Sequence, residues 1–226
     1  MRLNIVGIEK ISSNVKSKLS KYELDEYCNL TECKQEDFLL GRIALKQSLS
    51  SYTGKDFDQT VTIKNSKSGR PYINGKNDFF CSISHSYGHG IGIVSPFKVG
   101  ADIEKVRPHD RFLLNYIADI EEINLVSDFF GNQTDVVTLI WVIKESVMKG
   151  VGVGLKIPPK QVTITKKTST RNHFKVNIIS SDSSLTWYVW PIKKNDFYIG
   201  IAYEKEHKEE PNIHWYRDTC LQAAKN

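Results

Sequence analysis

A short pattern that occurs twice constrains the fold of this chain more than any other sequence feature. Residues 59–64, Gln-Thr-Val-Thr-Ile-Lys, resemble residues 160–165, Lys-Gln-Val-Thr-Ile-Thr. A helix-like stretch precedes each copy, and a basic polar turn and a strand pattern follow it, at 78–83 and at 196–201. The repetition favours an α+β protein of two similar halves. Helix–turn–strand units that only look alike are the alternative.

The two helix-like stretches, residues 37–50 and 136–149, each carry an apolar stripe at helical spacing. The stripe residues are Phe38, Leu39, Ile43, Leu45 and Leu49 in the first stretch and Leu139, Ile140, Ile143, Val147 and Met148 in the second. A run of alternating glycines then ends the second helix. This spacing leaves Lys144, Glu145 and Lys149 on the remaining surface of that helix.

The composition is that of an ordinary globular protein, with 40% hydrophobic and 25% charged residues among 226. A chain of this length buries a core without needing disulfides or a structural metal. Its apolar runs are too short for a membrane span or the core of a signal peptide, so we expect a cytoplasmic protein with no membrane partner. The four cysteines form no CxxC pair, which favours free thiols over a zinc site.

A basic turn and a histidine-bearing strand form the first candidate binding segment. Arg70 lies in a Gly-Arg-Pro turn that Lys64 and Lys67 precede. Ser84 and His85 end the strand that follows, and both side chains can bind an anion. These residues suit a phosphate pocket, although a solvated basic turn and a structural histidine would explain them as well.

Residues 99–105, Val-Gly-Ala-Asp-Ile-Glu-Lys, predict a strand. Because alternate side chains of a strand share a face, Asp102 and Glu104 project side by side, with apolar residues on the opposite face. Adjacent carboxylates repel each other unless a cation or a proton lies between them. The segment is therefore either part of a site or an exposed edge strand with an acidic face.

The second helix contributes a third carboxylate. Glu145 and Lys149 are i and i+4 neighbours, and Lys144 is adjacent to them. An ordinary surface ion pair would explain this spacing by itself. Three carboxylates that can meet around Mg²⁺, several cations and a histidine are, taken together, the equipment for phosphoryl transfer.

Four motifs in this order resemble the signature motifs of the 4'-phosphopantetheinyl transferases. They are Gly-Arg-Pro-Tyr at 69–72, Ser-Ile-Ser-His-Ser at 82–86, Val-Gly-Ala-Asp-Ile-Glu-Lys at 99–105 and Trp-Val-Ile-Lys-Glu-Ser-Val-Met-Lys at 141–149. The chain is similar to the monomeric, surfactin-synthetase-activating class of this family from about residue 37 to 201. The resemblance implies transfer of phosphopantetheine from coenzyme A to a serine of an apo acyl, peptidyl or aryl carrier protein, with adenosine 3',5'-bisphosphate as the other product.

The resemblance also implies roles for individual residues. Asp102, Glu104 and Glu145 would ligate Mg²⁺, with Mn²⁺ as the alternative, and Glu104 is the ligand that water replaces in some relatives. Glu145, Lys149 and His85 would be the catalytic residues, with Glu145 accepting the proton of the attacking serine. The residues that would bind coenzyme A are Lys64, Lys67, Arg70, Ser84, His85, Lys144 and Lys149. Lys34 or Arg42 would hold its 3'-phosphate.

The family fold implied by this resemblance is a pseudo-dimer of two similar α/β halves, with the active site in the cleft between them. We expect residues 1–98 to form the half that binds the coenzyme A nucleotide and residues 99–205 the half with the metal and catalytic residues. Residues 206–226 are expected to form a C-terminal tail. Because each half supplies a partner surface to the other, we expect a monomer.

Two other kinds of function stay open at this stage. A catalytically inactive module that binds coenzyme A or a carrier protein would share this fold, although it would not need a complete set of metal ligands and a base. A nucleic-acid-binding protein is disfavoured, since the net charge of +5 is spread through the chain without a basic–aromatic cluster.

Overall fold

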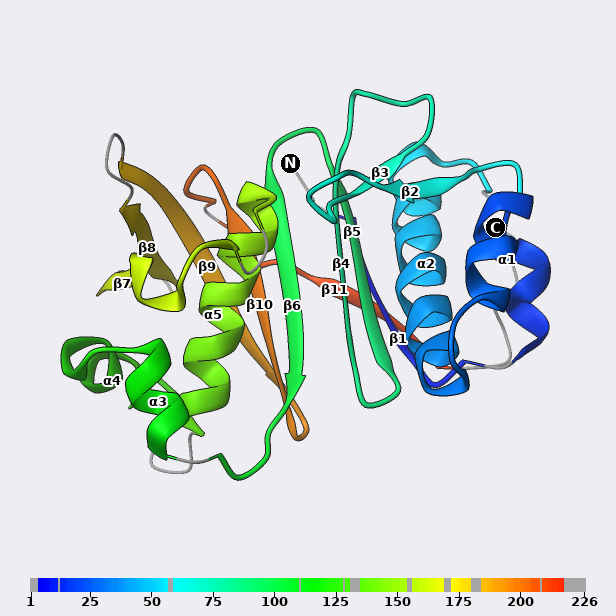
Figure 1. The fold of residues 1–226 in the computed structure, drawn as a ribbon. Helices are drawn as coiled ribbons and strands as arrows, with labels where there is room; N and C mark the ends of the chain where they lie inside the picture. Colours follow the sequence, from blue (N-terminus) through cyan, green and yellow to red (C-terminus); the bar gives the residue numbers. More distant parts are fainter. Residues whose placement is uncertain are drawn as a thin grey trace. The chain divides into compact units, whose positions relative to one another are not determined.

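The computed structural model describes residues 4–11, 13–56, 59–109, 111–127, 129–130, 135–153, 156–168, 172–179, 184–207 and 209–217. They form two compact units, each with its own sheet and long helix (Figure 1). Unit 1 comprises residues 1–97 and 211–226, and unit 2 comprises residues 98–210. The mixed α+β class predicted from the sequence is confirmed.

The main sheet of unit 1 has four strands in the order β11-β1-β5-β4. They are β1 (Asn4–Glu9), β4 (Phe80–Ser86), β5 (His89–Ser95) and β11 (Ile213–Arg217). β11 pairs in parallel with β1, whereas the other pairings are antiparallel. The sequence places residues 206–226 in a separate tail, but β11 instead completes the sheet of unit 1. The strand expected at 78–83 forms as β4 but runs from Phe80 to Ser86, with Ser84 and His85 near its end as expected.

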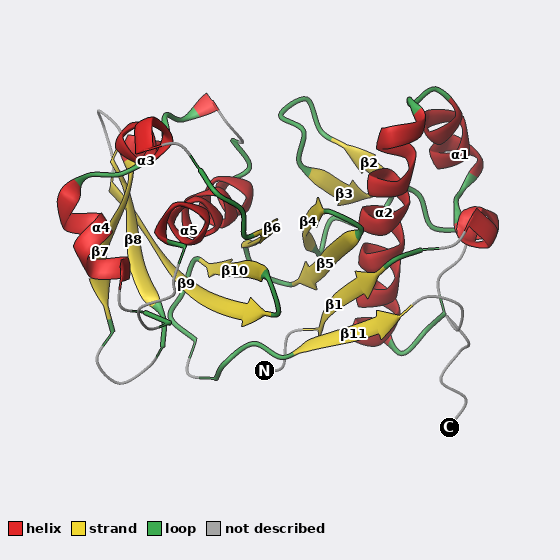
Figure 2. Ribbon diagram, turned by 90° about the horizontal axis from the view of Figure 1, so that it is seen from below, coloured by secondary structure: helices red, strands yellow, loops and turns green. Residues whose placement is uncertain are grey.

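The long helix α2 (Glu32–Thr53) packs against the strands β1, β4 and β5 (Figure 2). It approaches β5 closely because Gly92 has no side chain: a Cβ atom there would overlap the backbone of Ala44 and Leu45. The smaller elements of unit 1 are a 3₁₀ helix (Ser13–Lys18), α1 (Lys21–Cys28), β2 (Ile63–Asn65) and β3 (Pro71–Ile73). β2 and β3 pair as a separate two-stranded sheet, and Gly69 in the turn between them has a φ of 87°.

Unit 2 is built on a five-stranded antiparallel sheet in the order β6-β10-β9-β8-β7. The strands are β6 (Val99–Lys105), β7 (Val162–Lys167), β8 (Phe174–Ile179), β9 (Ser184–Lys194) and β10 (Phe197–Tyr203). The helices are α3 (Arg111–Ile117), α4 (Ile120–Ser127), α5 (Val136–Val151) and a short 3₁₀ helix (Pro159–Gln161). The strand predicted at 99–105 forms with those bounds as β6, and α5 packs against β6, β9 and β10.

The ends of α5 follow from local sequence. The Asp135 carboxylate accepts a hydrogen bond from Thr138 N over 2.7 Å at the N-terminus, and Gly152 ends the helix with a φ of 83°. Gly100 of β6 lets the two elements touch, because a Cβ atom there would overlap the backbone of Ser146 and Gly150. None of the helices in the described part of the chain combines the length and hydropathy needed to cross a bilayer.

Candidate active site

Four charged residues of unit 2 gather where α5 packs on β6. Asp102 and Glu104 lie two residues apart on β6, and Glu145 and Lys149 lie one turn apart on α5. Lys149 Nζ donates to Asp102 Oδ1 over 2.7 Å. Since Asp102 is only 1% exposed, this ion pair compensates a carboxylate that has lost most of its hydration. The structure thus brings together the three carboxylates and one of the two helix lysines that the sequence singled out.

Glu145, the carboxylate that α5 contributes to this cluster, has an altered acidity. Burial raises the pKa of Glu145, the Lys149 ammonium lowers it in part, and the charges of Asp102 and Glu104 raise it further. Its Oε2 atom is buried and has no hydrogen-bond partner among the described residues. A carboxylate with a raised pKa and an oxygen that lacks a hydrogen-bond partner can accept a proton or bind a cation.

The chemistry of the cluster fits a hard divalent cation. Mg²⁺ prefers oxygen ligands, and the Glu145 oxygen that lacks a hydrogen-bond partner belongs to a carboxylate that Asp102 and Glu104 repel. A cation would relieve this repulsion. As the described side chains stand, no three His, Cys, Asp or Glu residues are spaced to hold a metal ion. The positive charge beside Asp102 is the Lys149 ammonium, so a metal bound here would compete with Lys149 for that carboxylate.

Lys144 lies on the same helix but on its buried side. Its Nζ atom donates to the carbonyl oxygens of Ile117 and Pro159 and to Glu122, over 2.6, 3.2 and 2.9 Å. An ammonium has three N–H groups, and these three contacts use all of them. The side chain is 0% exposed, so the expectation that Lys144 lies on the helix surface is wrong. We therefore do not assign Lys144 to coenzyme A.

A pocket of about 270 Å³ lies beside Glu104 in unit 2. The residues that line it include Glu104, Arg107, His109, Leu113, Thr138 and Trp141. His109 Nε2 lies 3.0 Å from Thr138 Oγ1, which fixes the imidazole against the first turn of α5. Trp141, the first residue of the fourth motif, forms part of the apolar wall. The pocket is therefore lined both by a candidate metal ligand, Glu104, and by apolar side chains.

A second pocket, of about 230 Å³, lies in unit 1. Its lining includes Asp37, Phe38 and Arg42 of α2, Gly69 of the Gly-Arg-Pro turn, and Ile83 and His85 of β4. His85 Nδ1 lies 3.4 Å from Asp37 Oδ1, so a protonated imidazole would be held by that carboxylate. His85 of the second motif and Gly69 of the Gly-Arg-Pro turn thus border one pocket.

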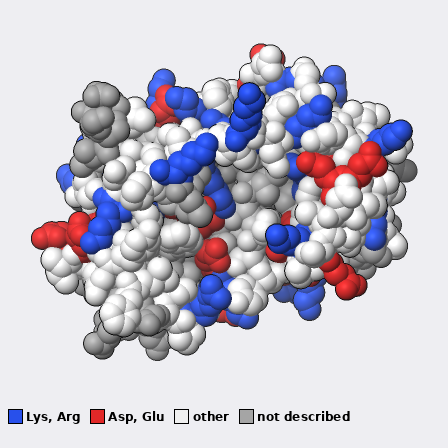
Figure 3. All heavy atoms as spheres, viewed as in Figure 1, with Lys and Arg blue, Asp and Glu red and all other residues white. Residues whose placement is uncertain are grey.

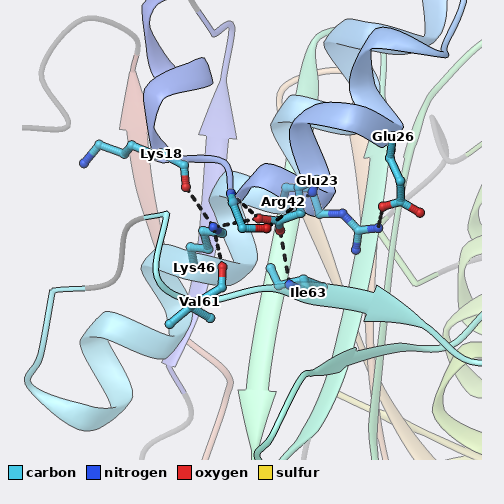
Figure 4. Close-up of polar contacts among 8 residues, drawn as sticks. Lys18, Glu23, Glu26, Arg42, Lys46, Val61 and Ile63 are labelled. Atoms are coloured by element: carbon cyan, nitrogen blue, oxygen red, sulfur yellow. Dashed lines mark hydrogen bonds and ion pairs between the residues drawn. The ribbon is translucent and has the colours of Figure 1, made fainter.

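Arg42 is the most deeply buried cation at this pocket, with 4% of its surface exposed. Burial lowers the pKa of Arg42, and Glu26 partly offsets that effect. The Arg42 Nη2 atom lies 3.4 Å from Glu26 Oε2 (Figure 4). The guanidinium carbon lies 4.8 Å from the centre of the Phe38 ring. A guanidinium keeps its charge despite such burial, so Arg42 is a fixed positive charge at the pocket.

The predicted basic residues of the turn are not among the residues that line this pocket. Lys64 Nζ lies 4.9 Å from the centre of the Tyr22 ring, and Lys67 is exposed. Arg70 places its guanidinium carbon 5.1 Å from the centre of the Phe80 ring, and burial lowers its pKa. Its Nη2 atom is buried without a hydrogen-bond partner among the described residues. Ser84 is buried in β4, 4% exposed.

Two residues at these pockets were not singled out from the sequence. Asp37 is the first residue of the helix predicted at 37–50. The only feature of the sequence that could have indicated its role is that its carboxylate lies one helical turn before Gly41, which also lines the pocket. His109 lies in the loop after β6, five residues beyond Glu104, where it reads as an ordinary loop histidine. On the face shown in Figure 3, Lys and Arg side chains occur in small groups among acidic and neutral ones, in keeping with a mild net charge.

Comparison with protein families places one match on unit 2. Residues 98–202 match the 4'-phosphopantetheinyl transferase superfamily. The matched segment contains Asp102, Glu104, Glu145 and Lys149. It begins at the first residue of unit 2.

Curated relatives extend the similarity to most of the chain. A 4'-phosphopantetheinyl transferase of Aneurinibacillus migulanus is 27% identical over 74% of this chain and 68% of its own. An L-aminoadipate-semialdehyde dehydrogenase-phosphopantetheinyl transferase of Schizosaccharomyces pombe is 23% identical over 91% of this chain and 87% of its own. A 4'-phosphopantetheinyl transferase of Bacillus subtilis is 31% identical over 44% of this chain and 45% of its own.

Proposed function

We propose that this chain, whose residues 98–202 match the 4'-phosphopantetheinyl transferase superfamily, transfers the 4'-phosphopantetheine group of coenzyme A to a serine of a carrier protein. The observation that carries this proposal is the cluster of Asp102, Glu145 and Lys149, which lies inside the family segment. A module that only binds coenzyme A has no need of a buried ion pair beside a carboxylate with a raised pKa.

The reaction requires one proton acceptor and a stabilised leaving group. The serine Oγ forms a bond to the phosphorus that carries the pantetheine arm, and the bond from that phosphorus to the oxygen of adenosine 3',5'-bisphosphate breaks. We assign Glu145 Oε2 as the acceptor of the serine proton, directly or through water, because this buried oxygen has no hydrogen-bond partner among the described residues and burial raises the pKa of its carboxylate. Lys149 offsets the charge that develops on the departing phosphate.

Magnesium dependence is part of the proposal. Asp102, Glu104 and Glu145 would hold Mg²⁺, with Mn²⁺ as the alternative, and the bound ion would neutralise charge on the pyrophosphate. Support comes from the Glu145 oxygen that lacks a hydrogen-bond partner among the described residues and from the mutual repulsion of the three carboxylates. Lys149 is now paired with Asp102, and a metal ion held by Asp102 would leave the Lys149 ammonium available to the substrate.

Unit 1 is proposed to bind the nucleotide of coenzyme A. Its pocket presents His85 and the fixed charge of Arg42, and Ser84 and Arg70 lie on neighbouring positions of β4 and of the turn. We assign the phosphate oxygens to Ser84 and His85. The adenine and 3'-phosphate are assigned to the basic residues Lys64, Lys67, Arg70 and Arg42.

The arrangement of the whole enzyme is a further part of this proposal. We propose a monomeric pseudo-dimer of two similar halves with coenzyme A between them, because one unit carries the nucleotide residues and the other carries the carboxylates. A cytoplasmic location agrees with the free thiols of Cys28, Cys33 and Cys81. The carrier would serve fatty-acid, polyketide or nonribosomal peptide synthesis.

Incubation with coenzyme A, Mg²⁺ and a panel of apo carrier proteins tests the function. Intact mass spectrometry should show that at least one carrier gains one phosphopantetheine, and that the gain disappears when its acceptor serine is replaced by alanine. Coenzyme A binding without a mass gain on any carrier would favour the inactive module. Absence of both would overturn the proposed function.

A further inference from the structure

Unit 1 contains the same buried lysine contacts that hold Lys144 in unit 2. The lysine in unit 1 is Lys46 of α2, whose contacts are drawn in Figure 4. Its Nζ atom donates to the carbonyl oxygens of Lys18 and Val61 over 2.8 and 2.7 Å, and lies 2.8 Å from Glu23 Oε2. Each unit therefore ties its long helix to a short helix through a buried lysine–glutamate pair and two carbonyl contacts.

Each copy of the repeated sequence pattern supplies a backbone N–H group that donates to the glutamate of the lysine–glutamate pair. Ile63 N donates to Glu23 Oε1 over 3.2 Å, and Ile164 N donates to Glu122 Oε1 over 2.8 Å. The two glutamates lie 99 positions apart, and the two isoleucines lie 101 positions apart. The same set of contacts thus recurs in both units at matching places in the sequence.

Only one of the two lysines precedes a candidate catalytic residue. Lys144 is followed by Glu145, whereas Lys46 is followed by Gln47. Unit 1 therefore has the lysine contacts on a helix that carries no carboxylate at the next position. What the two lysines share is the anchoring of a long helix, not the chemistry of the residue that follows.

In unit 2 this anchoring acts on the helical turn that carries Glu145. On one side of α5, the missing side chain of Gly100 lets β6 touch the backbone of Ser146. On another side, Lys144 holds the helix to Glu122 of α4 and to the carbonyl oxygen of Pro159. Both contacts lie within one residue of Glu145, so they fix the rotation and the height of that turn.

We propose that Lys144, together with Glu122, is a positioning residue that sets the place of Glu145 opposite Asp102, and that Lys144 does not touch coenzyme A. The inference rests on the proposed function, because Glu145 is the proton acceptor only in that reaction. It gives the lysine of the fourth motif a role that its buried ammonium can perform from where it lies.

The test compares Lys144→Met, Glu122→Gln and the double variant Lys144→Met/Glu122→Leu. Loss of one buried charge strands the other, whereas replacing both with apolar side chains is often tolerated, so the double variant is expected to fold even where a single variant does not. For each folded variant, turnover is measured at saturating carrier and coenzyme A. Coenzyme A affinity is measured separately by calorimetry in EDTA.

We expect turnover per folded molecule to fall about 10- to 100-fold in all three variants, the usual size of a loss when the support of an active-site ligand is removed. Coenzyme A affinity in EDTA should stay within about 2-fold, because Lys144 makes no contact with it. The matched control is Lys46→Met, which removes the equivalent contacts from α2, where the residue after the lysine is not a carboxylate. It should lower stability but leave turnover at saturating coenzyme A within about 3-fold.

Two results on an active protein would overturn the inference. Weaker coenzyme A binding in Lys144→Met but not in Glu122→Gln would make Lys144 a ligand. Unchanged turnover per folded molecule in the double variant would make the contacts merely structural. If the wild-type protein modifies no carrier, the proposed function fails instead, and hydrogen exchange of residues 141–149 in the double variant then decides whether Lys144 holds that turn. Exchange as slow as in the wild type would reject it.

Discussion

Lys149 and Asp102 form an ion pair of 2.7 Å that joins α5 to β6 within unit 2. The side chain of Asp102 is 2% exposed, whereas that of Lys149 is 26% exposed. The carboxylate therefore depends on the ammonium for compensation of its charge, while the ammonium retains contact with water. Loss of the ammonium would therefore leave a buried carboxylate without a compensating charge.

Lys149→Met should destabilise the protein by about 3 kcal/mol, because it strands the buried charge of Asp102. Urea denaturation followed by fluorescence measures this loss. Adding Asp102→Asn should restore most of the stability, since the stranded charge is gone. The double variant should nevertheless fail to modify a carrier protein. A double variant as unstable as Lys149→Met would show that the ion pair is not the source of the loss.

Glu145→Gln should reduce turnover far more than Glu104→Gln. The amide keeps the size of the side chain but cannot accept the serine proton, and general bases contribute about 10²- to 10⁴-fold in rate. Glu104→Gln should be milder, because Mg²⁺ readily keeps water in place of one ligand. Both rates are measured on the best carrier at several Mg²⁺ concentrations. Near-normal transfer by a folded Glu145→Gln variant would reject the assigned mechanism.

The parts of this site that sequence reasoning predicted are those set by local periodicity. The strand 99–105 is bounded as predicted, because Asp102 and Glu104 alternate with apolar residues. The helix that carries Glu145 and Lys149 follows from its apolar stripe and its terminal glycines. Alternation and helical spacing are properties of neighbouring residues, so they can be read without knowing the fold.

The parts that sequence reasoning missed depend on contacts between distant segments. The spacing of the apolar stripe leaves Lys144 on the helix surface, whereas its partner Glu122 lies 22 residues away on another helix. Strand β11 was assigned to a tail because only its parallel pairing with β1, from the other end of the chain, makes it a strand. Neither partner can be identified from the spacing of nearby residues.

Gly100→Ala should reduce both stability and turnover. A methyl group at this position meets the backbone of Ser146 and Gly150, which cannot turn away as a side chain would, so α5 must shift on β6. Overpacking of this kind costs about 1–3 kcal/mol and should displace Glu145 as well. Thermal melting and turnover per folded molecule measure the two effects.

The control for this substitution is Gly92→Ala, which meets the backbone of α2 in unit 1 in the same way. It should lower stability by a similar amount without moving α5. Turnover at saturating coenzyme A should then be retained better than in Gly100→Ala. Equal losses of turnover in the two variants would show that Gly100→Ala does not lower turnover by shifting α5.

Cys81 should be unreactive in the native protein although its thiol is free. Burial raises the pKa of Cys81 to about 12, an effect that Arg70 partly offsets, and the residue is 1% exposed. Because the folded-state pKa lies above the ordinary value of 9.0, the protonated thiol contributes stability below about pH 9, and this contribution is lost as the pH rises toward 12. Iodoacetamide at about pH 8 should therefore modify the exposed Cys28 and Cys33 but leave Cys81 intact until urea is added. Peptide mass mapping identifies the modified cysteines, and alkylation of native Cys81 as fast as that of Cys28 would contradict the burial of this thiol.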